Sequence, residues 1–211
     1  LPQLICGSEG TLAVITQVTL RVLSKPEATQ TVLAVFDRVK TSGNAVYEVR
    51  RSGIVPAKIE LMDNWVIRQI EQRTPLGLPL EADAILLFEL DGATEAVAKE
   101  AKRVIELCQK AGATEVRAAK NAKEATDFWT ARRAGFSAVW SSAPTILAED
   151  VTVPVSRIAD FIDYIDVLRK KYGVSIIIIG HAGDGNLHPS VLTDKRDAAH
   201  YRNAEQAVSD I

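Results

Sequence analysis

The spacing of apolar residues alternates along residues 27–120 between a period of two and a period near 3.6. These periods are typical of half-buried strands and of amphipathic helices. Strands are predicted at 31–36, 57–61, 84–90 and 114–117. Helices are predicted at 39–51, 62–73 and 97–108, the last stopped by Gly112. The strand at 57–61 alternates apolar residues with Lys58 and Glu60, so it is expected to be half-exposed.

The second half of the chain repeats this order of elements. It is predicted to contain a strand at 146–153, a helix between an N-cap at Ser156 and a stop at Gly173, a strand at 174–179, a return strand to about residue 193 and a helix at 194–211. The pattern predicts an α+β fold, with ferredoxin-like antiparallel sheets, helices on one face and a β-α-β-β-α-β order that is partly duplicated. The second copy stops before its last strand, so this domain is expected to be truncated at its C-terminus.

A separate segment precedes this pattern. Apolar and polar residues alternate from Val14 to Val22, which predicts a strand there. Residues 24–27, with Pro26, break the alternation and favour a boundary. The chain is therefore divided into residues 1–26 and 27–211.

The composition indicates a globular protein and excludes several classes of function. The 211 residues are 47% hydrophobic and 25% charged, with a net charge of −2 and basic residues spread along the chain, which does not favour nucleic-acid binding. Cys6 and Cys108 lie far apart and are expected to be reduced intracellular thiols. No uncharged apolar run approaches the roughly 20 residues of a transmembrane helix, and the first residues lack the basic segment of a signal peptide.

The strongest chemical pattern is the stretch 180–189, Gly-His-Ala-Gly-Asp-Gly-Asn-Leu-His-Pro. If Asp184 and Gly185 form a two-residue hairpin loop, His181 lies directly opposite His188 on the same sheet face. Two imidazoles suit Zn²⁺ or another borderline divalent ion, but catalytic zinc usually takes three protein ligands.

The alternatives at this hairpin stay open on sequence alone. Glu149 and Asp150 are candidates for a third metal ligand, since their strand could neighbour the hairpin. A structural pair of histidines that bond the backbone of a tight turn is the competing interpretation. Asn186 is either a turn residue or a polar ligand.

Two further stretches carry weaker patterns. Arg132 and Arg133 follow Trp129 on a predicted helix, and either could clamp a carboxylate. The competing interpretation is a solvated arginine or one that lies across the indole ring. Residues 7–11 are rich in glycine without the lysine of a P-loop. They could let backbone N–H groups approach a phosphate or a ring, or could form a plain turn.

The stretch 6–16 resembles the end of the FAD-binding domain in FAD-linked 2-hydroxy acid oxidases and dehydrogenases, which are flavoproteins of the vanillyl-alcohol-oxidase type. The stretch 180–189 resembles the signature of their C-terminal cap domain, and 59–64, 84–92 and 128–132 match the same family in order. The resemblance is greatest to the glycolate oxidase FAD subunit, followed by D-lactate dehydrogenases. It implies that residues 1–26 are the last segment of the FAD-binding domain and that 27–211 are the cap, or substrate, domain.

The resemblance also implies roles for individual residues. His181 and His188 would be ligands of a divalent metal (Zn, Mn or Fe), Asn186 would lie near the substrate, and Arg132 would hold its carboxylate. The backbone of the FAD-domain segment would touch FAD at Gly7, Ser8, Gly10, Thr11, Val14 and Ile15. One departure is Ala148 and Glu149, where some relatives have a substrate-binding lysine. The family's later Glu-His-Gly motif, which supplies another metal ligand and a base, does not occur in these 211 residues.

These features predict the substrate domain of an FAD-dependent enzyme that oxidises glycolate, D-lactate or a related 2-hydroxy acid by hydride transfer to flavin. Its expected partners are the substrate, the FAD-binding domain of the same polypeptide, and other oxidase subunits or an electron acceptor. The expected location is cytoplasmic, with the periphery of the inner membrane as a variant. This stretch alone is expected to be inactive and free of flavin. The alternatives are a non-catalytic α+β module that binds a metal or a partner, and a metal-assisted hydrolase.

Overall fold

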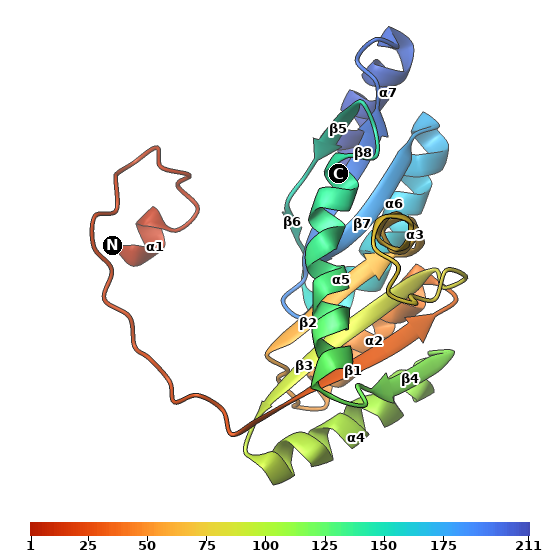
Figure 1. Ribbon diagram of the computed structural model, residues 1–211. Helices are drawn as coiled ribbons and strands as arrows, with labels where there is room; N and C mark the ends of the chain where they lie inside the picture. Colours follow the sequence, from red (N-terminus) through yellow and green to blue (C-terminus); the bar gives the residue numbers. More distant parts are fainter.

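One antiparallel sheet runs through the molecule in the order β4-β1-β3-β2-β7-β8-β5, with the short β6 paired to β8 (Figure 1). The computed structural model describes residues 1–211. The strands are β1 (Ala28–Phe36), β2 (Lys58–Asp63), β3 (Ala84–Gly92), β4 (Glu115–Ala118), β5 (Thr145–Ala148), β6 (Val151–Thr152), β7 (Ser175–His181) and β8 (Asn186–Thr193). The helices are α1 (Pro2–Ile5), α2 (Val39–Arg51), α3 (Asn64–Arg73), α4 (Thr94–Lys110), α5 (Ala122–Trp140), α6 (Ile158–Tyr172) and α7 (Ala198–Asp210), with a 3-10 turn, η1, at Val155–Arg157.

The sheet has the partly duplicated order that the sequence predicts. The first unit contributes β4-β1-β3-β2 and the second contributes β7-β8-β5, and the two join where β2 pairs with β7. The α+β class and the antiparallel pairing are therefore confirmed. The two units form one continuous sheet, because β2 of the first and β7 of the second both leave an edge that the other can pair.

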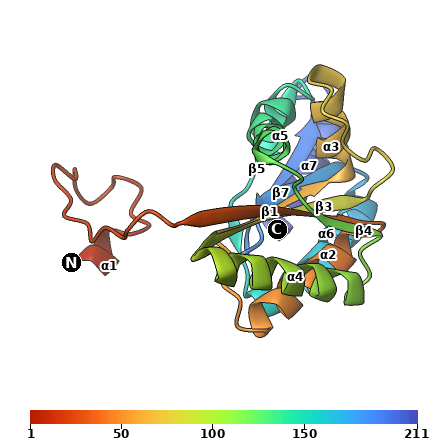
Figure 2. The ribbon, with the colours of Figure 1, turned by 60° about the horizontal axis from the view of Figure 1, so that its bottom comes forward.

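Helices cover both faces of this sheet (Figure 2). Side chains of α2, α4, α6 and α7 pack with Val32 and Ala34 of β1 in one core, whereas α3 and α5 pack with Leu33 and Val35 in a second. The expectation of helices on one face holds for the first four and is wrong for α3 and α5. The central strands are apolar at successive positions, so both faces need a cover. For the same reason β2 is buried from Ile59 onward, and the half-exposed strand predicted there is wrong.

Some predicted boundaries shift for local reasons. Gly173 ends α6 with φ 63°, as expected, and Asn121 caps α5 by accepting the Glu124 N–H. Ser156 makes no cap, because the chain enters α6 through η1. The strand predicted at 146–153 is interrupted at Glu149 and Asp150, which separate β5 from β6. That interruption turns Asp150 toward β8.

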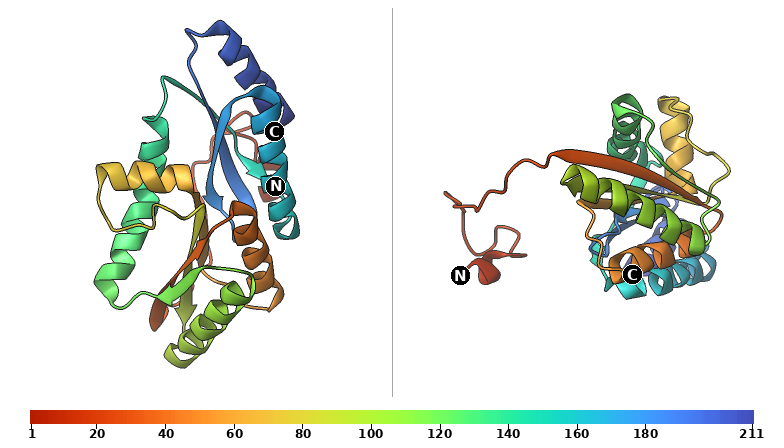
Figure 3. Two further views of the ribbon diagram at one scale, coloured as in Figure 1. Left: turned by 90° about the vertical axis from the view of Figure 1, so that its right-hand side faces the viewer. Right: turned by 90° about the horizontal axis from the view of Figure 1, so that it is seen from below.

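Residues 14–22 do not form the predicted strand. They lie in an extended, exposed segment between α1 and β1 that projects from the body of the molecule (Figures 1 and 3). Val14, Val18, Leu20 and Val22 are all largely exposed. A strand needs a neighbour for its backbone N–H and C=O groups, and no other segment of this chain pairs with these residues.

None of the helices has the length and apolarity that crossing a bilayer requires.

Asp63 at the end of β2 should make stability depend on pH. It is buried, accepts N–H groups of Val66 (3.1 Å) and Ile178 (2.7 Å), and burial raises its pKa to about 6. Between about pH 4 and 6, Asp63 is therefore protonated in the folded state and ionised in the unfolded state. The contribution of Asp63 to the free energy of unfolding should therefore fall as pH rises through this window, by about 3 kcal/mol at most.

Urea unfolding of the 211-residue protein at pH 4.5, 5.5 and 7 measures this slope. Asp63→Asn should remove the Asp63 part of the slope, whatever it does to stability at a single pH. Asp83→Asn is the control and should leave the slope unchanged, because Asp83 is an exposed aspartate directly before Ala84, the residue that pairs with Asp63. Equal slopes in the native protein and in Asp63→Asn would contradict the assignment.

Candidate active site

The β7–β8 hairpin carries both histidines, but its register differs from the predicted one by two residues. His181 pairs with Asn186, and His188 pairs with Ile179. The connection is a four-residue turn at 182–185, because a type I′ loop needs positive φ at both central residues and only Gly185 (φ 82°) has it. A shift of two keeps side chains on the same face. The imidazoles are therefore diagonal neighbours, with ring centroids 5.2 Å apart and planes at 87°.

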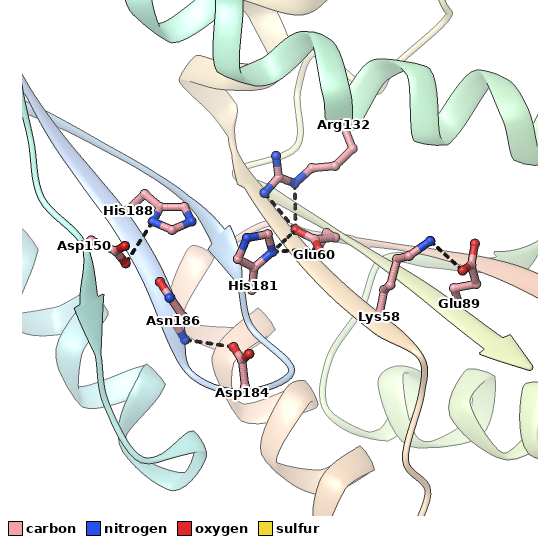
Figure 4. A network of polar contacts seen from close by, with 9 residues as sticks. All are labelled: Lys58, Glu60, Glu89, Arg132, Asp150, His181, Asp184, Asn186 and His188. Carbon is pink, nitrogen blue, oxygen red and sulfur yellow. Dashed lines mark hydrogen bonds and ion pairs between the residues drawn. The ribbon is translucent and has the colours of Figure 1, made fainter. Parts of the chain in front are cut away.

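Glu60 of β2 joins two of the predicted site residues (Figure 4). Its Oε2 accepts from Arg132 of α5, whose Nε and Nη2 both lie 2.8 Å away. Its Oε1 lies 2.8 Å from His181 Nδ1. Because a carboxylate can only accept, Nδ1 carries the ring proton and Nε2 presents a lone pair. The Glu60 and Arg132 side chains are 10% and 13% exposed, so this contact is largely shielded from water.

Sequence reasoning missed Glu60. A signal is present, since Glu60 is an acid between Ile59 and Leu61 and is followed by Met62. The alternation with Lys58 at 57–61, however, is typical of a strand with one exposed face and predicts a solvent-facing Glu60. Glu60 is buried only because α5 packs over this side of β2.

His188 has a carboxylate neighbour of its own. Its Nδ1 lies 3.3 Å from Asp150 Oδ1, which comes from the break between β5 and β6. Burial lowers the pKa of His188 below its ordinary value, the charges of His181 and Arg132 act in the same direction, and Asp150 opposes them. His188 is therefore a neutral imidazole near pH 7 that can accept a proton or a hydrogen bond at Nε2.

A cavity of about 490 Å³ lies between α5 and the sheet at this point. Its lining consists of Arg132, Phe136, Val139, Trp140, Ala148, Glu149, Asp150, Ile179, His181, His188 and Ser190. Gly135 sets how closely α5 approaches, because a Cβ at that position would lie 2.8 Å from Ile179 Cδ1. The structure thus brings Arg132, His181 and His188 together.

The other predicted residues lie elsewhere. Asn186 faces His181 across the hairpin but does not line the cavity, and its buried Oδ1 has no hydrogen-bond partner. The candidate FAD contacts lie in the projecting N-terminal segment, where Gly7 and Gly10 have positive φ and Thr11 Oγ1 donates to Ser8 O (2.6 Å). They do not meet the histidines.

The structure contains no group of three or more His, Cys, Asp or Glu side chains arranged to hold a metal ion. Asp150 contacts the proximal nitrogen of His188 and is not a third ligand beside the two Nε2 atoms. The residues present therefore fit half of a zinc site at most.

Residues 25–211 match the family model of FAD linked oxidases, C-terminal domain. The chain belongs to this family. As an FAD-linked oxidase C-terminal domain, it is 37% identical, over its whole length, to the glycolate oxidase subunit GlcD of Bacillus subtilis, of which it covers 45%. It is 31% identical, over 98% of its length, to a mitochondrial D-lactate dehydrogenase [cytochrome] of Arabidopsis thaliana, of which it covers 36%.

Solved structures support the fold of this FAD-linked oxidase C-terminal domain. An alkyldihydroxyacetonephosphate synthase superposes with a TM-score of 0.66 and 16% identity, covering 97% of this chain and 45% of the other. A p-cresol methylhydroxylase also gives 0.66, with 14% identity, covering 89% of this chain and 43% of the other. At these identities the likeness concerns the fold alone. The chain spans less than half the length of these curated relatives.

Proposed function

We propose that this domain forms the substrate-binding wall of an FAD-dependent oxidoreductase that oxidises glycolate, D-lactate or a related 2-hydroxy acid. The observation that carries the proposal is the convergence of Arg132, His181 and His188 on one cavity. A 2-hydroxy acid presents a carboxylate and a hydroxyl on adjacent carbons. One guanidinium beside two imidazole lone pairs complements both groups.

The three residues have distinct roles in this proposal. Arg132 binds the substrate carboxylate through the N–H groups that Glu60 leaves free, since a guanidinium has five donors. His188 Nε2, or His181 Nε2, accepts the proton of the hydroxyl, which a neutral imidazole can do near pH 7. α5 and the sheet exclude water from one side.

The flavin belongs to another part of the protein in this proposal. FAD supplies the acceptor for the hydride that leaves the hydroxyl-bearing carbon. Residues 1–26 form the end of an FAD-binding domain, with Gly7, Ser8, Gly10, Thr11, Val14 and Ile15 toward FAD. Their exposed apolar side chains and unpaired backbone support this, because both suit burial against another sheet. Other oxidase subunits or an electron acceptor, and a cytoplasmic location, stay predictions.

A divalent ion also stays a prediction, and it would take the same Nε2 lone pairs that otherwise accept the proton. The proximal nitrogens of His181 and His188 face carboxylates, an arrangement common in metal-binding histidines. A third ligand would have to come from outside the residues described, so no step of the reaction is assigned to a metal. No observation favours the metal-assisted hydrolase or the non-catalytic module.

Arg132→Lys tests the carboxylate contact. In the FAD-loaded enzyme that contains this chain, it should raise KM for glycolate or D-lactate about 10–100-fold, because lysine cannot form the paired N–H contacts of a guanidinium. Arg133→Lys is a matched control on the next position of α5, where the side chain is exposed and bonds Thr130. It should change KM less than about twofold. Equal effects of the two substitutions would overturn the assignment, and flavin absorbance checks that both variants retain FAD.

A further inference from the structure

Arg132, Phe136 and Trp140 form one line along α5, since residues four apart lie on the same face of a helix. All three line the cavity that contains the histidines. Phe136 and Trp140 are 65% and 50% exposed, with ring centroids 6.0 Å apart. Large aromatic side chains are usually buried. An exposed aromatic pair beside a cavity is therefore typical of a surface that binds an apolar group.

The α5 side of the cavity changes from polar to apolar along the helix. Arg132 is followed there by Phe136, Val139 and Trp140, whereas the opposite side is mixed and consists of Ala148, Glu149, Asp150, Ile179, His181, His188 and Ser190. The helical rise puts Phe136 about 6 Å and Trp140 about 12 Å along the axis from Arg132. An acid held by its carboxylate at Arg132 would have a substituent on C2 within the same cavity as these rings.

The size of the cavity agrees with such a ligand. Glycolate has five non-hydrogen atoms and fills roughly 100–150 Å³, at about 30 Å³ for each water-sized group. The cavity of about 490 Å³, which is open to solvent on one side, has room for an acid larger than glycolate.

We propose that Phe136 and Trp140 are specificity-determining residues that bind an apolar substituent on C2 of the substrate. The inference rests on the proposed function and narrows its substrate class to 2-hydroxy acids with a branched aliphatic or aromatic side chain. Phe136 contacts the first carbons of the substituent, and Trp140 contacts its far end.

Steady-state kinetics on the FAD-loaded enzyme test this with glycolate, D-lactate, 2-hydroxy-4-methylpentanoate and phenyllactate. For the native enzyme, kcat/KM should rise with the apolar side chain, at least tenfold from glycolate to phenyllactate, since even one methylene group is worth about tenfold in an apolar pocket. Phe136→Ala and Trp140→Ala should each lower kcat/KM for phenyllactate at least tenfold and change that for glycolate less than threefold. Tyr47→Ala, on an exposed aromatic of α2 across the sheet, should change neither.

Three results would overturn the inference. One is a native enzyme that does not prefer the larger acids, and another is an equal loss for glycolate and phenyllactate in both variants. The third is loss of FAD or a lower melting temperature in the variants, which would mean that the aromatic pair packs against the flavin-binding domain. Failure of the proposed function gives a different result, because none of the four acids would then reduce the flavin of the native enzyme.

Discussion

Glu60→Ala should lower kcat/KM for the 2-hydroxy acid about 10–100-fold, as removal of a carboxylate that orients a functional histidine commonly does. Glu60 fixes the ring proton of His181 on Nδ1 and holds Arg132 over the cavity (Figure 4). Without the Glu60 carboxylate, the proton of His181 is no longer held on Nδ1, so Nε2 does not always present a lone pair and kcat should fall. Arg132 also loses the contact that holds its guanidinium in place, so KM should rise.

The same substitution should lower the free energy of unfolding by about 3–5 kcal/mol, because it leaves a buried guanidinium without its counter-charge. Glu60→Gln separates the two effects. The glutamine keeps the shape and an oxygen that can accept from Arg132, but it removes the negative charge and places an NH2 donor beside His181 Nδ1. It should therefore recover only part of the stability lost in Glu60→Ala, while kcat still falls.

Glu89→Gln is the matched control, since Glu89 pairs with Lys58 on the neighbouring strand in a more exposed ion pair. It should cost at most about 1 kcal/mol of stability and leave both kinetic constants unchanged. If Glu60→Gln behaved like Glu89→Gln in kcat and KM, Glu60 would have no part in positioning the site. Urea unfolding and steady-state kinetics on the same preparations give all of these quantities.

Gly185→Ala should destabilise the protein by about 2–4 kcal/mol. A Cβ at residue 185 would lie 1.9 Å from Val153 O, a backbone atom that cannot move without shifting β6. The positive φ of 82° adds strain for any L-residue with a side chain. The strain accounts for about 1 kcal/mol and the steric overlap for about 1–3 kcal/mol.

Gly173→Ala isolates the first of these contributions. Gly173 has φ 63°, and a Cβ at residue 173 would have no heavy atom within 4 Å, so alanine there meets strain without overlap. Its cost should be about 1 kcal/mol. Equal destabilisation by the two substitutions, measured by urea unfolding, would show that β6 does not pack on the hairpin as described.

Gly185→Ala should also disturb the candidate active site. The Val153 N–H donates to Gly185 O (3.1 Å), and the same segment carries Asp150 to His188. Displacing β6 should therefore raise KM for the acid, whereas Gly173→Ala, at the far end of α6, should leave KM unchanged.

The family and the order of elements could be predicted from the sequence, because they depend on local patterns, and so could the candidate residues Arg132, His181 and His188 that line one cavity. Helical spacing placed α2 at the residues observed and α4 and α6 close to them. The stretch 180–189 identified the histidine pair. The prediction that both imidazoles lie on one face of the sheet is correct although the register differs by two residues, because side chains on a strand return to the same face every two residues.

Contacts between distant segments could not be predicted in the same way. Glu60 and His181 are 121 residues apart, and they meet only because β2 and β7 pair at the join between the two units. Nothing in the local pattern around Glu60 distinguishes a solvent-facing acid from one covered by a helix.

The amino-acid sequence was sufficient to predict most helices and strands from residue 28 onward and to identify the histidine pair. Three features depend on tertiary packing: α3 and α5 cover the second face of the sheet, Glu60 contacts Arg132 and His181 instead of solvent, and Phe136 and Trp140 line the same cavity as the histidines. The physical reason is that periodicity records whether a side chain is buried, whereas the partner that buries it depends on strand pairing and helix placement across the whole chain.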